Sequence, residues 1–261
     1  MHRPFFSIVV TAFNSEPTLG EALTSINAQT FKSHEIIVVY TESKDNTLNI
    51  INIHRKNIAI LLHSPRLGPY HAMNQAIPHC KGLYTLFLNS DDFFASTAAL
   101  ELLFTYIKSH AKPSVVFGKV TIVNSSNPCI HLYKWPQPPP IMRISDSIRY
   151  LGYPPPHPSL TVKTNIITRH LFNENLSLCA DYHQIISIAF SLKDGNSFGY
   201  VPYDIVYMRA GGLTNSSLNN LLIGMVQIFT AQSLVVRPPI FIFTCFVGRC
   251  VYRLLQLRPF K

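Results

Sequence analysis

The carboxyl-terminal part of the sequence lacks acidic residues: none follows Asp204, whereas Arg and Lys recur to the last position. Charged residues make up only 13% of the chain, hydrophobic residues make up 47%, and the net charge is +9. The late basic residues are interleaved with long aliphatic stretches. This pattern favours an anionic membrane surface over nucleic acid as the partner of the basic region.

The sequence also lacks paired cysteines. The five cysteines are scattered and show no C-x-x-C spacing: Cys80, Cys129, Cys179, Cys245 and Cys250. We therefore expect neither a zinc site nor a disulfide framework, and a reducing compartment is the simpler expectation. The early apolar run at 5–13 has no small-x-small cleavage site after it, so we interpret it as a first strand.

Apolar runs alternate with stretches of helical periodicity through the first half of the chain. The expected strands lie at 5–11, 35–40, 58–63, 84–88 and 114–123, and the expected helices at 18–29, 45–55, 67–79 and 96–110. Thr18 and Glu21 have the spacing of a capping box. The alternation predicts an α/β fold with a mostly parallel, doubly wound sheet flanked by helices.

The stretch 124–158 differs because it is rich in proline and holds the only tryptophan, Trp135. Proline disfavours both helix interiors and central strands. We therefore expect a long functional loop or crossover there. Beyond it, strands are predicted at 158–162 and 197–209, and helices at 165–170 and 181–193.

Two adjacent aspartates, Asp91 and Asp92, end the apolar run at 84–88. Burial of an unpaired carboxylate costs several kcal/mol, so we place both at the carboxyl end of a buried strand, where open α/β sheets bind ligands. Adjacent carboxylates suit Mg²⁺ or Mn²⁺. The alternative is that Asp91 caps a turn and Asp92 is solvated.

Several fragments, taken in order, resemble glycosyltransferase family 2, which has the GT-A (Rossmann-like) fold and includes bacterial surface-polysaccharide enzymes. The fragments lie at 7–14, 29–31, 35–39, 66–77, 81–82, 86–92, 157–159, 180–182 and 209–212, within a resemblance that covers roughly 5–215. It implies a GT-A domain at 1–217, with a nucleotide-sugar half at 1–123 and an acceptor half at 124–217. The remaining 218–261 form an apolar, basic tail.

The resemblance implies a donor site and a metal site. The residues expected to bind a nucleoside-diphosphate-sugar are Thr11, Phe13, Asn14, Glu42, Arg66, Asn74, Asn89, Ser90 and Asp91. The residues expected to hold Mg²⁺ or Mn²⁺ are Asp91, Asp92 and His157. The alternatives are a plain strand-to-helix turn at 11–14, a solvated loop arginine at Arg66 and a structural histidine at His157.

Asp181 matches the general base of the family, which removes a proton from the acceptor hydroxyl. The alternative is a helix N-cap, because an apolar-periodic helix follows it. Three positions depart from the family pattern, since Tyr40, His71 and Asn89 stand where acids are usual.

The expected function is inverting transfer of a sugar from a nucleoside-diphosphate-sugar to a glycan or lipid-linked acceptor, in surface polysaccharide biosynthesis. The three missing acids support an alternative, a catalytically inactive homologue that binds a nucleotide or a partner enzyme. A nucleotidyltransferase is disfavoured because 11–18 lacks a glycine-rich phosphate loop.

Pro238 and Pro239 divide the tail, so one continuous helix is excluded. Neither half has about 18 unbroken apolar residues, the length of a confident membrane span. In the second half, Phe243, Val247, Cys250 and Leu254 share one helical face, opposite Arg249, Arg253 and Gln256.

This pattern predicts an amphipathic helical tail peripheral to the cytoplasmic, inner face of the plasma membrane. Its cations would contact anionic headgroups: Arg249, Arg253, Arg258 and Lys261. The alternatives are a tail packed on its own domain or on a partner, and a true span. Under the membrane hypothesis, a chain ending near Asn219 stays folded and becomes soluble.

Overall fold

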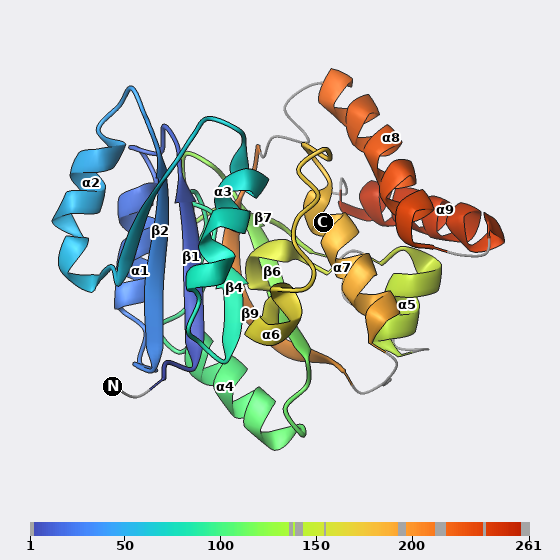
Figure 1. The fold of residues 1–261 in the computed structure, drawn as a ribbon, viewed down its shortest axis with the longest axis horizontal. Coiled ribbons are helices and arrows are strands. Elements are labelled where there is room, and N and C mark those ends of the chain that lie inside the picture. The colour runs from blue at the N-terminus through green and yellow to red at the C-terminus, as the bar shows by residue number, and fades with distance from the viewer. Residues whose placement is uncertain are drawn as a thin grey trace.

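A computed structural model describes residues 3–135, 138, 143–153, 155–192, 197–211, 218–236 and 239–256. One sheet runs through the centre of the molecule, with helices on both faces (Figure 1). Its strands are ordered β3-β2-β1-β4-β8-β6-β9-β5, and β7 pairs with β6 off this path.

The first half of the sheet is parallel, as the sequence predicts. Its strands are β1 (Phe6–Ala12), β2 (His34–Thr41), β3 (Ile60–Ser64) and β4 (Tyr84–Phe87). Its helices are α1 (Leu19–Asn27), α2 (Thr47–Ile53), α3 (Pro69–Ala76) and α4 (Ala99–Ser109). The chain builds outward from β1 to β3 and then returns to place β4 on the other side of β1. Strand order therefore reverses between β1 and β4, which is where such sheets bind ligands.

The second half makes the sheet mixed rather than mostly parallel. Its strands are β5 (Phe93–Phe94), β6 (Val115–Val123), β7 (His131–Lys134), β8 (Thr161–Lys163) and β9 (Phe198–Arg209). Strand β8 is antiparallel to both β4 and β6, while β6 and β9 are parallel. Strands covered on both faces show no alternation of polarity, so their direction was not readable from the apolar runs.

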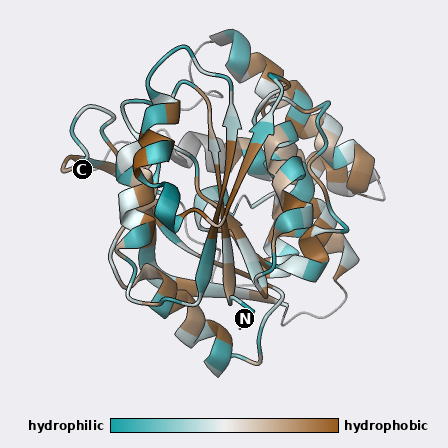
Figure 2. Ribbon diagram, turned by 60° about the vertical axis from the view of Figure 1, so that its left-hand side comes forward, coloured by the Kyte–Doolittle hydropathy of each residue, from teal (hydrophilic) through white to brown (hydrophobic). Residues whose placement is uncertain are grey.

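Strand residues alternate between two hydrophobic cores, one on each face of the sheet. In β1, Phe6, Ile8 and Val10 face the core under α1, α2 and α4, whereas Val9 faces the core under α3 and α7 (Ala180–Ser191). In Figure 2 the strands at the centre are largely hydrophobic, and the helices carry much of the hydrophilic colour. This three-layer arrangement confirms the α/β class that the sequence predicts.

The proline-rich stretch contains regular structure that the sequence analysis did not predict. Strand β7 and helix α5 (Ile144–Leu151) both lie in it. The Trp135 amide donates to the Val120 carbonyl at 2.8 Å and continues the pairing of β7 with β6. Helix α5 ends at Gly152, whose φ of 63° is a left-handed C-cap. The prolines lie outside both elements, which is why they do not prevent them.

The predicted capping box at the start of α1 does not form in the described structure, where Thr18 makes no side-chain cap bond. Glu21 instead forms an ion pair with Arg209, at the end of β9. Glu21 therefore bonds Arg209, which is distant in the sequence, instead of the start of its own helix. The carboxylate ties the first helix to the last strand of the sheet.

The tail forms two helices, α8 (Leu218–Val235) and α9 (Pro239–Gln256), which pack against α7 and α5 on the right of Figure 1. Ile228 and Ala231 of α8 are buried in the core. The Gln232 side chain donates to the Tyr182 hydroxyl at 2.9 Å. The tail is therefore packed on its own domain, which was one of the alternatives, and its removal at Asn219 would expose this core.

The orientation of α9 differs from the amphipathic prediction. Phe243 and Val247 are exposed, as expected of a membrane-facing side, but Arg249 turns inward and lies over the Tyr182 ring at 5.4 Å. The Arg253 side chain, Arg258 and Lys261 lie outside the described residues. Among the helices that are described, none is long and apolar enough to cross a membrane.

The close approach of α9 to α5 leads to a stability prediction. A Cβ added at Gly248 would lie 2.0 Å from the Leu151 carbonyl oxygen, so Gly248→Ala must force the helices apart. Overpacking of this kind costs about 1–3 kcal/mol, although Gly→Ala inside a free helix gains up to about 1 kcal/mol. We expect a lower free energy of unfolding, measured by urea denaturation.

The matched control is Gly20→Ala in α1, where the nearest atom to the added Cβ is Ile50 Cγ2 at 3.8 Å. This variant should be as stable as the wild type or more so. A Gly248→Ala protein as stable as Gly20→Ala would contradict the close packing of α9.

Candidate active site

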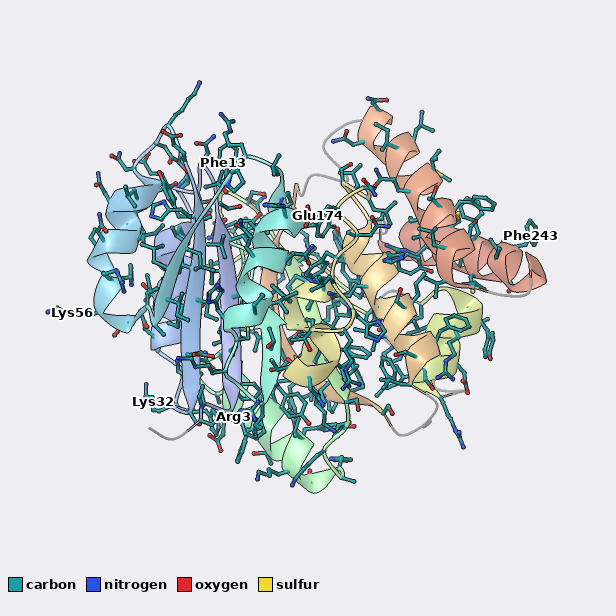
Figure 3. The ribbon with its side chains drawn as sticks, viewed as in Figure 1. Arg3, Phe13, Lys32, Lys56, Glu174 and Phe243 are labelled. Carbon is teal, nitrogen blue, oxygen red and sulfur yellow. The ribbon has the colours of Figure 1, made fainter. Side chains whose placement is uncertain are left out.

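A cleft of about 820 Å³ opens at the carboxyl ends of β1 and β4, where strand order reverses. Nine of the residues predicted from sequence line it: Thr11, Phe13, Asn14, Arg66, Asn89, Ser90, Asp91, His157 and Asp181. Phe13 lies at the upper edge of the molecule in Figure 3. The structure thus brings together side chains from both predicted halves of the domain.

The loop after β1 is held by the loop after β2. Asn14 has a φ of 47°, a left-handed conformation that asparagine tolerates well. Its side-chain oxygen accepts from the Lys44 amide at 3.0 Å, and its own amide donates to Ser43 Oγ at 3.0 Å. These bonds pre-form one wall of the cleft.

An aromatic ring and a cation stand together on this wall. The Arg66 guanidinium lies 4.6 Å from the centre of the Phe13 ring. A flat aromatic surface suits a nucleotide base, and an arginine suits phosphate oxygens. The pair therefore offers an aromatic ring and a cation at one place on this wall.

Asp91 is the carboxylate that β4 delivers to the cleft. Burial raises the pKa of Asp91 above its ordinary value, and the Arg209 guanidinium opposes this effect. A carboxylate so poorly solvated gains from a cation beside it. Its position agrees with the prediction from sequence.

Asp92 is buried beneath the cleft and is not among the described residues that line it. Its two oxygens accept from Asn89 Nδ2 at 2.9 Å and from the Arg209 amide at 3.2 Å. Burial and the neighbouring Asp91 raise the pKa of Asp92 well above its ordinary value. The structure therefore places Asp92 as a buried residue that holds the loop together. The metal hypothesis had placed it in the cleft as a ligand.

Arg209 is a central residue that the sequence analysis did not assign to the site. It lines the cleft, donates to the Asp91 carbonyl at 2.6 Å and lies 5.1 Å from the centre of the Phe93 ring. The fragment at 209–212 contains it, but its pairing with Glu21 depends on a contact between distant segments. Gly212, at the end of that fragment, lies outside the described residues.

A divalent metal fits the side chains that face the cleft. The Nε2 atom of His157 is buried without a hydrogen-bond partner in the described structure, and burial lowers the pKa of this histidine, so its ring is neutral. A neutral imidazole and the Asp91 carboxylate are both suitable ligands for Mn²⁺. The described residues contain no cluster of three His, Cys, Asp or Glu for an ion. Substrate phosphates would have to complete the coordination.

Asp181 lies in the first turn of α7, on the opposite side of the cleft from the loop after β1. The Tyr70 hydroxyl of α3 donates to its Oδ1 at 3.1 Å. Burial, and then Asp181, raise the pKa of Tyr70 well above its ordinary value, so Tyr70 remains a donor. The N-cap position belongs to Cys179, which makes no side-chain cap bond in the part that is described. The structure therefore does not place Asp181 at the N-cap, and its role as the base stays a prediction.

Two predicted donor-binding residues are not among the described cleft residues. Glu42 is exposed after β2. Asn74 lies on α3, and its side chain bonds the Phe172 backbone and Glu174. Its amide is thus bonded to the loop before α7, and this accounts for its separation from the cleft.

The three residues that stand where the family has acids have hydrogen-bond or ion-pair partners of their own. His71 Nδ1 lies 2.8 Å from Glu174, whose pKa is lowered by its bonds with Asn74 and His71. The Tyr40 hydroxyl accepts from the Ser43 amide at 3.1 Å. Asn89 bonds Asp92. Each of the three residues is therefore bonded to a neighbouring residue.

The three-layer sheet, with aspartates at the end of β4 and a cleft at the reversal point, is the GT-A architecture of glycosyltransferases. Solved structures bear this out at the level of fold. Staphylococcus aureus TarS (residues 1–349) superposes with a TM-score of 0.70 and 20% identity, covering 97% of this chain and 73% of that one. A mannosyltransferase from Pyrobaculum calidifontis, solved with GDP-Man and Mn²⁺, superposes with a TM-score of 0.63 and 18% identity, covering 97% and 71%.

Sequence comparison identifies the family. The model of "Glycosyl transferase family 2" matches residues 7–174, and the chain belongs to this family. A PGL/p-HBAD biosynthesis glycosyltransferase of Mycobacterium bovis is 33% identical over 130 residues, which cover 49% of this chain and 50% of that protein. A poly(ribitol-phosphate) beta-glucosyltransferase of Bacillus spizizenii is 28% identical over 208 residues, covering 77% and 32%. The chain thus spans half or less of the length of these curated relatives.

The contrast between the two aspartates leads to a paired prediction. Asp91→Asn should lower the release of sugar from a nucleotide-sugar by about 10²–10³-fold, because a stabiliser of the leaving diphosphate is lost. Asp92→Asn should keep most of this activity. Its remaining oxygen can accept from the Arg209 amide, and its new amide can donate to the Asn89 oxygen after Asn89 flips.

Both variants should be compared by donor hydrolysis and by thermal unfolding. Activity that is lost in the two variants alike, with unchanged folding, would show that Asp92 acts in the cleft itself.

Proposed function

We propose that this family 2 domain transfers a sugar from a nucleoside-diphosphate-sugar to a hydroxyl of a glycan or lipid-linked acceptor, with inversion at the anomeric carbon. The observation that carries the proposal is the arrangement of one cleft. Asp91 and the Phe13–Arg66 pair line it on the β1–β4 side, and Asp181, held by Tyr70, lines it on the other. A donor and an acceptor can therefore meet between them.

In the proposed step, the acceptor oxygen attacks the anomeric carbon while the bond from that carbon to the diphosphate oxygen breaks. Asp181 takes the proton of the attacking hydroxyl, and the nucleoside diphosphate leaves with the bonding electrons. A single displacement with one base inverts the configuration. A bound Mg²⁺ or Mn²⁺, held by Asp91 and His157, would supply counter-charge for the departing diphosphate.

The acceptor class is proposed from relatives. An Escherichia coli relative, 25% identical over 122 residues, is named as a UDP-Glc:alpha-D-GlcNAc-diphosphoundecaprenol beta-1,3-glucosyltransferase. TarS has been solved in complex with UDP and with UDP-GlcNAc. These names support a nucleotide-sugar donor and a lipid-linked or polymeric acceptor in surface polysaccharide synthesis.

The alternative is an inactive homologue that binds a nucleotide or a partner enzyme. It is favoured by the lack of acids at three positions where the family has them, namely Tyr40, His71 and Asn89. Asp91 and Asp181, which the proposed chemistry needs, both remain in the cleft. Hydrolysis of a panel of nucleotide-sugars, with and without Mn²⁺, separates the two functions and identifies the donor.

Although the inner side of the tail packs on its own domain, its outer side supports a proposal of membrane attachment by the intact fold. Its outer surface carries large exposed apolar side chains, namely Leu222, Val226, Phe229, Phe243 and Val247. Phe243 is 69% exposed and lies at the outer end of α9 in Figure 3. Such a surface suits a membrane interface, and the basic composition of the tail suits an anionic one, which we propose to be the cytoplasmic face. The fold would then hold the cleft beside a lipid-linked acceptor.

Asp181→Asn tests the base. We expect transfer to fall by about 10²–10⁴-fold, because the amide cannot take the proton. Donor affinity, measured by calorimetry, should stay near the wild-type value, since the base acts on the acceptor. An equal loss of donor affinity would contradict the base role.

Val226→Ser together with Phe229→Ser tests the membrane surface. Both side chains are at least half exposed, so the fold should survive, whereas binding to anionic liposomes should fall about tenfold or more through lost apolar burial. The control is Ile53→Ser on α2, at the opposite side of the molecule in Figure 1, where 78% of the side chain is exposed. Equal liposome binding by both variants and the wild type would refute attachment through this surface.

A further inference from the structure

The tail helix α9 places an arginine in the cleft. Arg249 is one of the residues that line it, and its guanidinium lies 5.4 Å from the centre of the Tyr182 ring. Its Nε and Nη1 atoms are buried and have no hydrogen-bond partner among the described residues. Within the described part of the chain, Arg249 forms no ion pair. A cation in this position needs an anion, and the described residues do not supply one.

Close packing fixes the direction in which Arg249 points. The preceding residue, Gly248, lies against the Leu151 carbonyl, and Gly152 lies against the Cys245 carbonyl. The Cys245 thiol donates to the Arg149 carbonyl at 2.7 Å. These contacts hold one face of α9 on α5, so Arg249 is directed inward while Phe243 remains outside.

The other two arginines that line the described cleft are less suited to an acceptor phosphate. Arg209 is paired with Glu21, and Arg66 lies over Phe13 on the donor side. Arg249 instead lies over Tyr182, the residue that follows the proposed base. Its contact with the ring face leaves the N–H groups at the edge of the guanidinium for other partners. Burial of a cation without such partners is costly, so a structural role alone does not account for it.

We propose that Arg249 binds a phosphate group of the acceptor, close to the hydroxyl that Asp181 activates. The planar guanidinium suits two phosphate oxygens at once. Because α9 also carries the exposed apolar surface, a phosphate that links a sugar to a lipid would approach from this side. The inference rests on the proposed transfer function and names the acceptor chemistry of that same cleft.

Trp135 provides a direct binding signal, because it is the only tryptophan of the chain and lines the same cleft. Its fluorescence can be followed while the full-length protein is titrated with hexyl phosphate, inorganic phosphate or hexanol. We expect saturable binding of hexyl phosphate and none of hexanol. Arg249→Gln should weaken phosphate binding by roughly ten- to hundredfold, through loss of charge-assisted bonds, and Arg249→Lys by less.

The matched control is Lys108→Gln, an exposed cation on α4, which does not line the cleft. It should bind the probes as the wild type does. Thermal unfolding of all variants shows whether α9 stays in place, and Arg249→Lys, which keeps the charge, separates binding from folding.

The two phosphate probes separate the sources of the anion. Tighter binding of hexyl phosphate supports a lipid-linked phosphate, and equal binding of inorganic phosphate supports a phosphate within a soluble or polymeric acceptor. Phosphate binding that survives Arg249→Gln, or that is lost only in Arg66→Gln on the donor side, would overturn the proposal. Because binding is measured without turnover, a wild type that binds phosphate through Arg249 but transfers no sugar would refute the transfer function alone.

Discussion

The burial of Asp91 and Asp92 at the end of β4 is the constraint on which the site depends. Two adjacent carboxyl groups at the rim of a hydrophobic sheet repel each other and resist burial, so the more buried of the two needs fixed partners. Asn89 and the Arg209 backbone bond Asp92, and the Arg209 side chain bonds the Asp91 carbonyl. This network leaves the Asp91 carboxylate as the group that faces the cleft.

Arg209 extends the same constraint across the fold. By pairing with Glu21 it connects the end of β9, the last strand that is described, to the first helix, α1. The tail continues this assembly on the other side, where α8 is bonded to Tyr182 and α9 brings Arg249 into the cleft. The cleft is therefore built from the first, middle and last parts of the chain.

Local patterns were sufficient for the α/β class and for most elements. The family resemblance pointed to Asp91, His157 and Asp181, which line one cleft, and their roles stay predictions. Local patterns failed where a distant partner decides the outcome. Glu21 has the spacing of a cap but pairs with Arg209, and Asn74 braces the loop at Phe172. Helical periodicity placed Phe243 and Val247 opposite Arg249, but the side that packs inward depends on Gly248 fitting against Leu151. Strand direction in the second half was likewise not encoded in the apolar runs.

The central claim is a single displacement in which Asp181 is the only base. The anomeric configuration of the first product formed tests it most directly. With a donor whose sugar is α-linked to the diphosphate, proton NMR of the product should show a β-glycosidic linkage through the coupling constant of its anomeric proton. An α-linked product would contradict the account, because it requires a second displacement or attack from the same face as the leaving group.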